Sequence, residues 1–154
     1  MSIEQEIGEI LVSRGETMAA AESCTGGSVA ARIVGVAGSS SYFNGGVVAY
    51  SNEVKVSILG VDGSDIDRYG AVSEQVARQM AEGARRVFDT TYGVATTGVA
   101  GPTGGSAQKP VGTVWFAVAT PESTVATLVV CGDHRAEVIE SATSRALQLL
   151  LEAL

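Results

Sequence analysis

The stretch "TMAAAESCTGGSVAARIVGVAG", Thr17 to Gly38, predicts a strand, a glycine turn and a helix in direct succession. Its first seven residues favour a short buried strand despite the poor strand propensity of alanine, because turn signals bound them on both sides. Val29, Ile33 and Val34 then recur at helical spacing. A strand that enters a helix through Gly-Gly brings small polar side chains and backbone N–H groups into the same small volume.

The same alternation of strands and helices continues along the chain. The expected elements are a helix over Ser2–Ser13, a strand over 44–51, a short helix over 53–60 capped by Asn52, a helix over Glu74–Phe88 capped by Ser73, strands over 92–98, 112–120 and 123–132, and a last helix over Asp133–Leu154. Helices alternate with strands in the first two thirds of the chain, and the last two strands are expected to form a hairpin. We therefore expect an α/β fold, a three-layer α/β/α sandwich with a mixed, mostly parallel sheet. Residues 1–154 should form one domain.

Composition excludes several classes of function. The net charge is −7 and the basic residues form no cluster longer than Arg85-Arg86, so nucleic acid is not an expected partner. No apolar run approaches the roughly 20 residues that a membrane span needs, and the N-terminus is acidic, so we expect a cytoplasmic protein without a membrane partner. Two cysteines and one histidine are too few to predict a metal site; we expect reduced thiols and no cofactor.

Ser23 is the first candidate nucleophile. The turn that follows it, Thr25-Gly26-Gly27, could direct backbone N–H groups at the oxygen of a tetrahedral intermediate. Ordinary helix capping is the competing interpretation for a serine at this place. Cys24 is expected to be a buried structural thiol, because no histidine partner is at hand: His134, the only one, follows "CGD" at a helix start, where a solvated surface role is expected.

The presence of Tyr50 and Lys55 favours a catalytic role for Ser23 over helix capping. A tyrosine at a strand end and a lysine in the next helical turn can converge on the same rim of the sheet. A cation in the first turn of a helix opposes the helix dipole, and this field, together with partial burial, favours the neutral amine that a general base requires. A solvated surface lysine is the alternative. Glu22, beside the serine, is the one carboxylate set apart from the polar helix faces.

The loop "TGVAGPTGGSAQKPVG" has a composition suited to binding an anion through backbone amides. Its candidates are Thr97, Gly98, Gly101, Gly104, Gly105 and Ser106. The complete phosphate-loop pattern is absent, because no Lys-Ser or Lys-Thr pair follows the glycines, so a mobile surface loop is an equal alternative.

Several of these segments together resemble a known family. "AESCTGG", "GSS" at Gly38 to Ser40, "GGVVAYSNEVKVSILGV", "GAVSEQVARQMAEGA", "TTGVAGPTGG" and "KPVGTVWFAV" occur in this order in the CinA C-terminal domain family, whose enzymes are nicotinamide-nucleotide amidases. The resemblance spans nearly the whole chain. It implies an α/β/α fold and hydrolysis of nicotinamide mononucleotide to nicotinate mononucleotide and ammonia, in pyridine-nucleotide salvage, by a stand-alone amidase domain.

The resemblance also implies which residues act. By motif, the catalytic residues of the family fall on Ser23, Tyr50 and Lys55, and Ser40 is expected to assist or to bind substrate. We expect Ser23 Oγ to attack the carboxamide carbon, with Lys55 and Tyr50 relaying the proton to the departing ammonia. The amides of Gly26 and Gly27 are expected to hold the oxyanion.

The 5′-phosphate of this substrate requires a separate anion site. The loop over 98–106 is the expected place, with Lys109 as the nearest cation. Two alternatives stay open: a catalytically silent nucleotide-binding module associated with competence or recombination proteins, and an amidase or Ser-Lys acyl hydrolase acting on a different amide. Whether the chain forms a homo-oligomer is also open.

Overall fold

Strand β1 (Met18–Glu22) lies inside a five-stranded sheet in the computed structural model, which describes residues 1–154. Its two neighbours, β2 (Phe43–Val48) and β3 (Tyr92–Gly98), both run parallel to it. Strands β4 (Thr113–Ala119) and β5 (Thr124–Val130) continue the sheet as an antiparallel hairpin, in the order β2-β1-β3-β4-β5. The sheet is mixed, as expected, and it is open.

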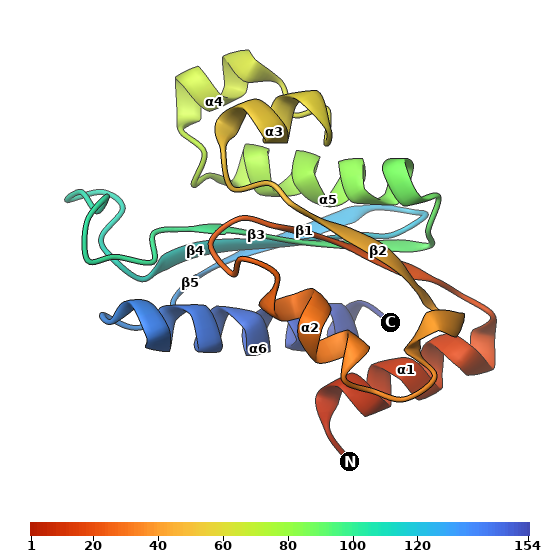
Figure 1. The fold of residues 1–154 in the computed structure, drawn as a ribbon. Coiled ribbons are helices and arrows are strands. Elements are labelled where there is room, and N and C mark those ends of the chain that lie inside the picture. Colours follow the sequence, from red (N-terminus) through yellow and green to blue (C-terminus); the bar gives the residue numbers. More distant parts are fainter.

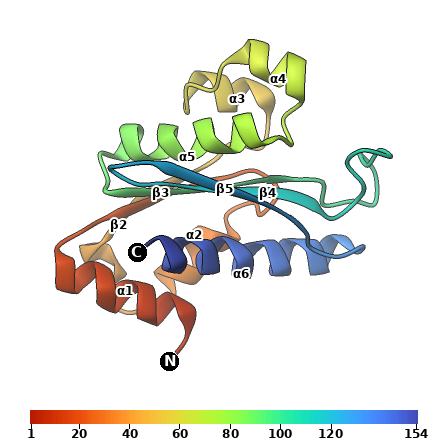
Figure 2. The same ribbon diagram turned by 180° about the vertical axis from the view of Figure 1, so that it is seen from behind.

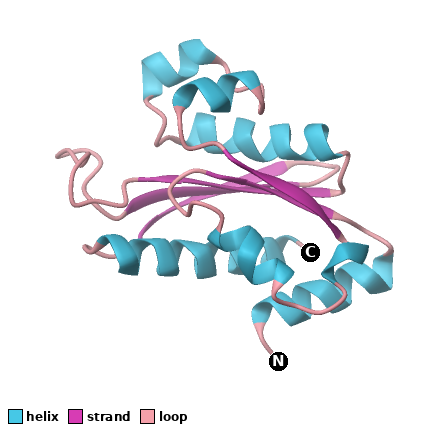
Figure 3. Cartoon of the chain, in the orientation of Figure 1, coloured by secondary structure: helices cyan, strands magenta, loops and turns pink.

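Helices cover both faces of the sheet, so the predicted three-layer α/β/α architecture is confirmed (Figures 1 and 3). The bounds are α1 (Ile3–Arg14), α2 (Ser28–Val34), the 3-10 turn η1 (Ser39–Ser41), α3 (Asn52–Ser57), α4 (Gly63–Tyr69), α5 (Glu74–Phe88) and α6 (Arg135–Ala153). Helices α3, α4 and α5 lie on one face and α1, α2 and α6 on the other, as the view from behind also shows (Figure 2). None of the helices is both long and apolar enough to cross a membrane.

Two helical features differ from the sequence-based expectation. Ser51, rather than Asn52, caps α3, because its hydroxyl accepts a hydrogen bond from the Val54 amide at 3.2 Å. Helix α4 was not expected at all. It buries a single side chain, that of Ile66, so its sequence carries no repeating apolar pattern to reveal it.

Small residues bring α5 directly onto the sheet and onto the segment that follows α3. A Cβ atom on Gly93 of β3 would lie 2.2 Å from the carbonyl oxygen of Ala81 in α5. A Cβ atom on Gly83 of α5 would lie 2.1 Å from the carbonyl oxygen of Leu59. Both distances are far below any real contact of a Cβ atom, so the two glycines allow backbone to pack against backbone.

Candidate active site

The polar residues singled out in the sequence gather at the carboxyl ends of β1 and β3. The chain passes from β1 to β2 on one side and later to β3 on the other, which makes the gap between β1 and β3 a topological switch point. Ligands of open α/β sheets bind at such points, outside the carboxyl ends of the strands. This edge of the sheet lies on the left in Figure 1.

The alternation of side chains along β1 separates two neighbours, Glu22 and Ser23. Even-numbered residues such as Ala20 pack in the core shared with α2 and α6, whereas odd-numbered ones such as Ala21 pack in the core shared with α5. Glu22 accordingly bonds to α2, and Ser23 meets a side chain of α3. The end of the strand is fixed on both sides, because the Ser23 amide donates to the Thr96 carbonyl at 3.0 Å and the Ala49 amide to that of Glu22 at 2.7 Å.

Lys55 reaches Ser23 from α3 and is almost fully buried, with 1% of its surface exposed. Its Nζ lies 3.0 Å from Ser23 Oγ, 2.9 Å from the Ala49 carbonyl oxygen and 3.3 Å from that of Tyr50. A charged ammonium would donate to all three oxygens. A neutral amine would donate to the two carbonyls and accept the serine proton on its lone pair, so the two carbonyls aim that lone pair at Ser23.

Burial lowers the pKa of Lys55 below its ordinary value, and no carboxylate forms an ion pair with it to offset the effect. The expected tendency toward the neutral amine is therefore present, and burial, one of its two expected causes, is confirmed, whereas the other, the helix dipole, was wrongly assigned. Helix α3 has only six residues, and Lys55 falls in its last turn rather than opposing its N-terminus. Desolvation, not the helix dipole, is the main cause.

Glu22 occupies the N-terminus of α2, and this corrects the expected oxyanion site. Its carboxylate accepts hydrogen bonds from the amides of Gly27, Val29 and Ala30 at 2.9 to 3.2 Å. The Gly26 amide donates to the Ser23 carbonyl at 3.1 Å. Because the amides of Gly26 and Gly27 are both engaged, and neither residue lines the cavity at Ser23, the expectation that they hold an oxyanion is wrong.

Thr25 also faces away from the cavity. Its hydroxyl donates to Glu22 at 2.6 Å and lies 2.8 Å from the Thr96 hydroxyl, in a buried polar cluster beneath the turn. The cluster fixes the turn that carries Ser23, so Thr25 supports the site rather than lining it. A sequence signal existed, since a carboxylate ahead of Gly-Gly and a helix is a suitable partner for helical N–H groups.

The residue after Ser23 offers the free amide that the glycines lack. Cys24 lines the cavity beside Ser23, and its backbone N–H makes no hydrogen bond within the protein. The amide that follows a nucleophile is a common oxyanion donor. Cys24 as a residue is 5% exposed, and burial raises the pKa of its thiol to about 12, so the thiol stays protonated at neutral pH, as expected of a structural cysteine.

A cavity of about 330 Å³ opens above Ser23 and Lys55. This volume is at the lower end of the range of small-molecule sites. Four of the predicted loop and strand-end residues line it, namely Thr97, Gly98, Gly101 and Gly104, together with Asn52, whereas Gly105 does not. The Thr97 hydroxyl donates to the Ala71 carbonyl at 2.9 Å and so joins β3 to the wall ahead of α5.

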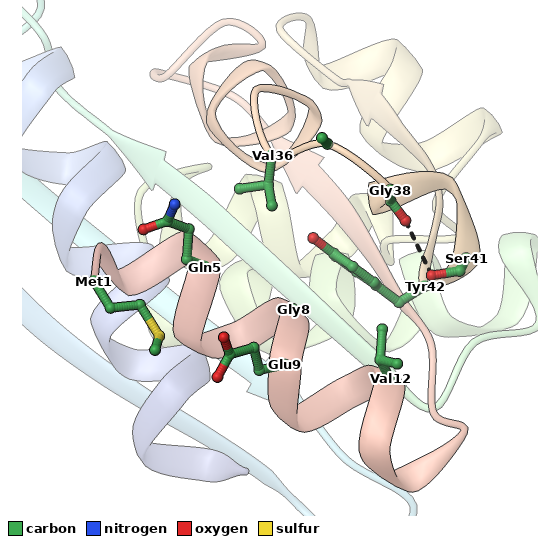
Figure 4. Close-up of a pocket in the computed structure, with 10 residues that line it drawn as sticks. Met1, Gln5, Gly8, Glu9, Val12, Val36, Gly38, Ser41 and Tyr42 are labelled. Atoms are coloured by element: carbon green, nitrogen blue, oxygen red, sulfur yellow. Dashed lines mark hydrogen bonds between the residues drawn. The ribbon is translucent and has the colours of Figure 1, made fainter.

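Ser40 lies far from this cavity, which corrects another expectation. It belongs to η1, just ahead of β2, and β2 starts beside Met18 at the opposite end of β1 from Ser23. The segment from Val36 to Tyr42 borders a different hollow, of about 660 Å³, whose other wall is α1 (Figure 4). That hollow is larger, but neither of its hydroxyl groups contacts a base, since the Ser41 hydroxyl donates to the Gly38 carbonyl and the Tyr42 hydroxyl has no hydrogen-bond partner.

The cation expected near the loop is also misplaced. Lys109 donates its Nζ hydrogen to the Tyr69 carbonyl and does not line the cavity. Arg135, the first residue of α6, lines it instead, and sequence reasoning missed this residue. The direction of the strands is the signal that could have located it. Because β5 runs antiparallel to β4 and hence parallel to β3, the helix after β5 must start at the same edge as the loop after β3.

Tyr50 and Lys55 meet through the tyrosine backbone and not through the phenol. Tyr50 is 58% exposed and lines the cavity, and its hydroxyl accepts a hydrogen bond from Arg135 Nη2 at 2.9 Å. His134 lies on the surface at the start of α6, as expected, with a side chain that is 79% exposed. No group of three or more His, Cys, Asp and Glu residues is placed to hold a metal ion.

The family model of the CinA C-terminal domain matches residues 1–154. The chain belongs to the CinA C-terminal domain family. A CinA-like protein of Salinibacter ruber is 55% identical over 119 residues, which cover 77% of this chain and 29% of that protein. A CinA-like protein of Acaryochloris marina is 50% identical over 123 residues, 80% of this chain and 29% of that protein. The chain therefore spans less than a third of these relatives.

Solved structures of the CinA family share the fold over nearly the whole chain. The competence/damage inducible protein CihA from Agrobacterium tumefaciens is 36% identical, with a TM-score of 0.91 over 99% of this chain and 96% of that one. The competence damage-inducible protein A from Klebsiella pneumoniae is 33% identical, with a TM-score of 0.93 over 97% and 93% of the two chains. The resemblance to the CinA family noted in the sequence is thus confirmed.

Proposed function

We propose that this CinA-family domain is a serine amidase that hydrolyses the carboxamide of nicotinamide mononucleotide. The observation that carries the proposal is the contact of 3.0 Å between Lys55 Nζ and Ser23 Oγ at the floor of a cavity. A serine hydroxyl becomes a competent nucleophile when a neighbouring base takes its proton. A buried amine of lowered pKa is suited to that task.

The reaction proceeds through an acyl-enzyme. Neutral Lys55 takes the proton of Ser23 as Oγ bonds to the carboxamide carbon, and the Cys24 amide donates to the oxyanion that forms. Protonated Lys55 then gives the proton to the amide nitrogen, the C–N bond breaks and ammonia leaves an ester on Ser23. Lys55 next takes a proton from a water molecule that attacks the carbonyl carbon of this ester. It returns that proton to Ser23 Oγ as the ester C–O bond breaks, which releases nicotinate mononucleotide and regenerates the serine and the neutral amine.

Two parts of the proposal rest on the family resemblance. One is the identity of the substrate, since the relatives carry only the CinA or competence-damage name. The other is the proton relay through Tyr50 that the resemblance implies; the mechanism above does not use it, because the phenol is bonded to Arg135 and forms no hydrogen bond with Ser23 or Lys55. A catalytically silent nucleotide-binding module is the second candidate, favoured by the competence-damage names of the relatives.

Ammonia release distinguishes these candidates. Purified protein would be incubated in parallel with nicotinamide mononucleotide, free nicotinamide and the nicotinamide dinucleotide, and ammonia would be measured for each. The proposal expects the mononucleotide to be the best substrate by kcat/KM, since binding energy from remote groups helps to position the reacting amide. Binding of the mononucleotide without turnover would support the catalytically silent module. A higher kcat/KM for another amide would mean that the domain is an amidase with a different substrate.

Two adjacent variants test the nucleophile. Ser23→Ala is expected to lower kcat by about 10³-fold or more, with the fold retained, because it removes the attacking oxygen and little buried surface. Cys24→Ala is the matched control and is expected to keep most of the activity, since the thiol is protonated and the amide of residue 24 remains. Circular dichroism and thermal unfolding would verify both folds. An inactive Cys24→Ala beside an active Ser23→Ala would overturn the serine mechanism.

A further inference from the structure

Arg135 closes one side of the cavity by joining three separate parts of the chain. From the first turn of α6, its Nη1 donates to the Gly101 carbonyl at 2.7 Å and its Nη2 donates to the Tyr50 hydroxyl at 2.9 Å. The loop after β3, the segment after β2 and the start of α6 therefore meet at one guanidinium. Neither of its partners carries a charge.

The charge of Arg135 has no partner of opposite sign within the protein. Arg32 and Arg78 each pair with a glutamate at 3.0 Å or less, whereas no carboxylate lies within ion-pair distance of Arg135. The guanidinium is an uncompensated positive charge that lines a cavity in a chain of net charge −7. It places a local positive potential at the cavity although the molecule as a whole repels anions.

Burial places Arg135 at the mouth of the cavity and the reacting groups at its floor. Ser23 and Lys55 are 8% and 1% exposed, whereas Arg135 and Tyr50 are exposed. A ligand whose amide lies against Ser23 would thus extend toward Arg135 with its other end. The fork of a guanidinium matches two oxygens of one phosphate group, and an oxyanion is a stronger acceptor than a phenol or a carbonyl.

We infer that Arg135 is the residue of this site that binds the phosphate monoester of the substrate and so selects a mononucleotide over the corresponding nucleoside. This inference rests on the proposed function for the orientation of the ligand. Because the guanidinium already has two neutral acceptors, the phosphate would replace the phenol of Tyr50 as the partner of Nη2. Lys109, the cation expected from the sequence, is engaged elsewhere and has no part in this contact.

Binding measurements on variants without the nucleophile test the inference. Isothermal titration calorimetry would compare nicotinamide mononucleotide with nicotinamide riboside on Ser23→Ala protein, alone and combined with Arg135→Ala, Arg135→Lys or Arg145→Ala. Arg145 is the matched control, because it is an exposed arginine of the same helix that does not line the cavity. Thermal unfolding would confirm that each variant is folded.

Arg135→Ala is expected to weaken mononucleotide binding by about tenfold or more, with riboside binding changed less than about twofold, since only the mononucleotide carries the charged acceptor. In the same Ser23→Ala background, the mononucleotide affinity of Arg135→Lys should lie between that of the protein with Arg135 intact and that of Arg135→Ala. Equal losses for the two ligands, or an equal loss in Arg145→Ala, would overturn the inference.

The proposed function is tested separately by ammonia release from the protein with Ser23 intact. If Arg135→Ala selectively weakens mononucleotide binding but the protein with Ser23 intact releases no ammonia, the phosphate-binding role of Arg135 is supported and the proposed amidase activity is contradicted. If ammonia is released but Arg135→Ala weakens the binding of mononucleotide and riboside equally, only the proposed role of Arg135 is contradicted.

Discussion

Lys55 combines burial, which disfavours its charged form, with three oxygen contacts that a neutral amine can also satisfy. A buried lysine without a carboxylate partner destabilises the charged form, which is why its pKa is lowered. The carbonyls of Ala49 and Tyr50 take the two hydrogens of the amine and leave the lone pair for Ser23. In the proposed mechanism this makes Lys55 the base, and its protonation should inactivate the site.

The pH dependence of activity tests this role of Lys55. The rate is expected to fall on acidification through an apparent pKa below the roughly 10.4 of a free lysine, because only the neutral amine accepts the serine proton. Lys55→Arg should be nearly inactive at every pH, since a guanidinium does not deprotonate. Kinetics between pH 5 and pH 10 would show both effects. A largely active Lys55→Arg with an unchanged profile would reduce Lys55 to a binding cation.

Individual site residues differ in how far the sequence reveals them. Ser23 and Lys55 were predicted because each was an unusual residue for its expected place, a serine ahead of a glycine turn and a lysine in a first helical turn, although Lys55 lies in the last turn of α3. Arg135 looked like any exposed arginine at a helix start, and its partner Tyr50 is 85 positions away. The amides of Gly26 and Gly27 were misassigned because nothing in the sequence shows that Glu22 already accepts hydrogen bonds there.

At the scale of elements, the site depends on how closely α5 approaches its neighbours. Gly83 of α5 touches the backbone of Leu59, which follows α3 and lies four residues after Lys55. Any group added at position 83 must push α3 and α5 apart. The position of the Lys55 amine over Ser23 is therefore linked to a glycine on another helix.

Gly83→Ala tests this contact. Helix propensity alone predicts stabilisation by about 1 kcal/mol, but the new Cβ would lie 2.1 Å from the Leu59 carbonyl oxygen. We expect a net destabilisation of about 1–3 kcal/mol, together with reduced kcat. Gly63→Ala in α4 is the matched control, because its Cβ would have only Val56 Cγ2 nearby, at 3.9 Å. Urea unfolding would measure the free energy of unfolding of both variants, and an increase for Gly83→Ala would refute the contact.

The elements that the sequence predicted well have strong local signals. Ser73 caps α5 and the apolar repeat over Glu74–Phe88 faces the core, so both bounds were predicted correctly. The place of "GSS" could not be predicted in the same way. Its serines follow α2 in sequence, but the sheet carries them to the end of β1 opposite Ser23, and strand order is a property of the complete fold.

On the scale of the whole molecule, stability and the state of Lys55 are linked. The unfolded chain holds the Lys55 proton up to its ordinary pKa, whereas the folded chain releases it at lower pH. Between the two values the unfolded state binds more protons, so the free energy of unfolding rises with pH. Below the folded pKa both states are protonated and the full cost of burying the charge remains.

Comparison with Lys55→Met isolates this contribution, because all other groups cancel in the difference. The wild type is expected to gain stability relative to the variant as pH rises through the window below about 10.4, by up to about 1.4 kcal/mol per pH unit. Urea unfolding of both proteins from pH 7 to pH 10 would measure the difference. A difference that falls with rising pH, or that stays constant throughout, would contradict a lowered pKa of Lys55.

The alternation along β1 has a consequence for how this protein can change over generations. Glu22 accepts hydrogen bonds from α2 and Ser23 contacts Lys55 of α3, on opposite faces of the sheet, because they are consecutive residues at the end of one pleated strand. Deleting or inserting a single residue between Met18 and Ser23 would exchange their sides, sending the carboxylate toward α3 and the hydroxyl toward α2. This segment can therefore accept exchanges of one amino acid for another, whereas codon gain or loss within it would remove the site in a single event.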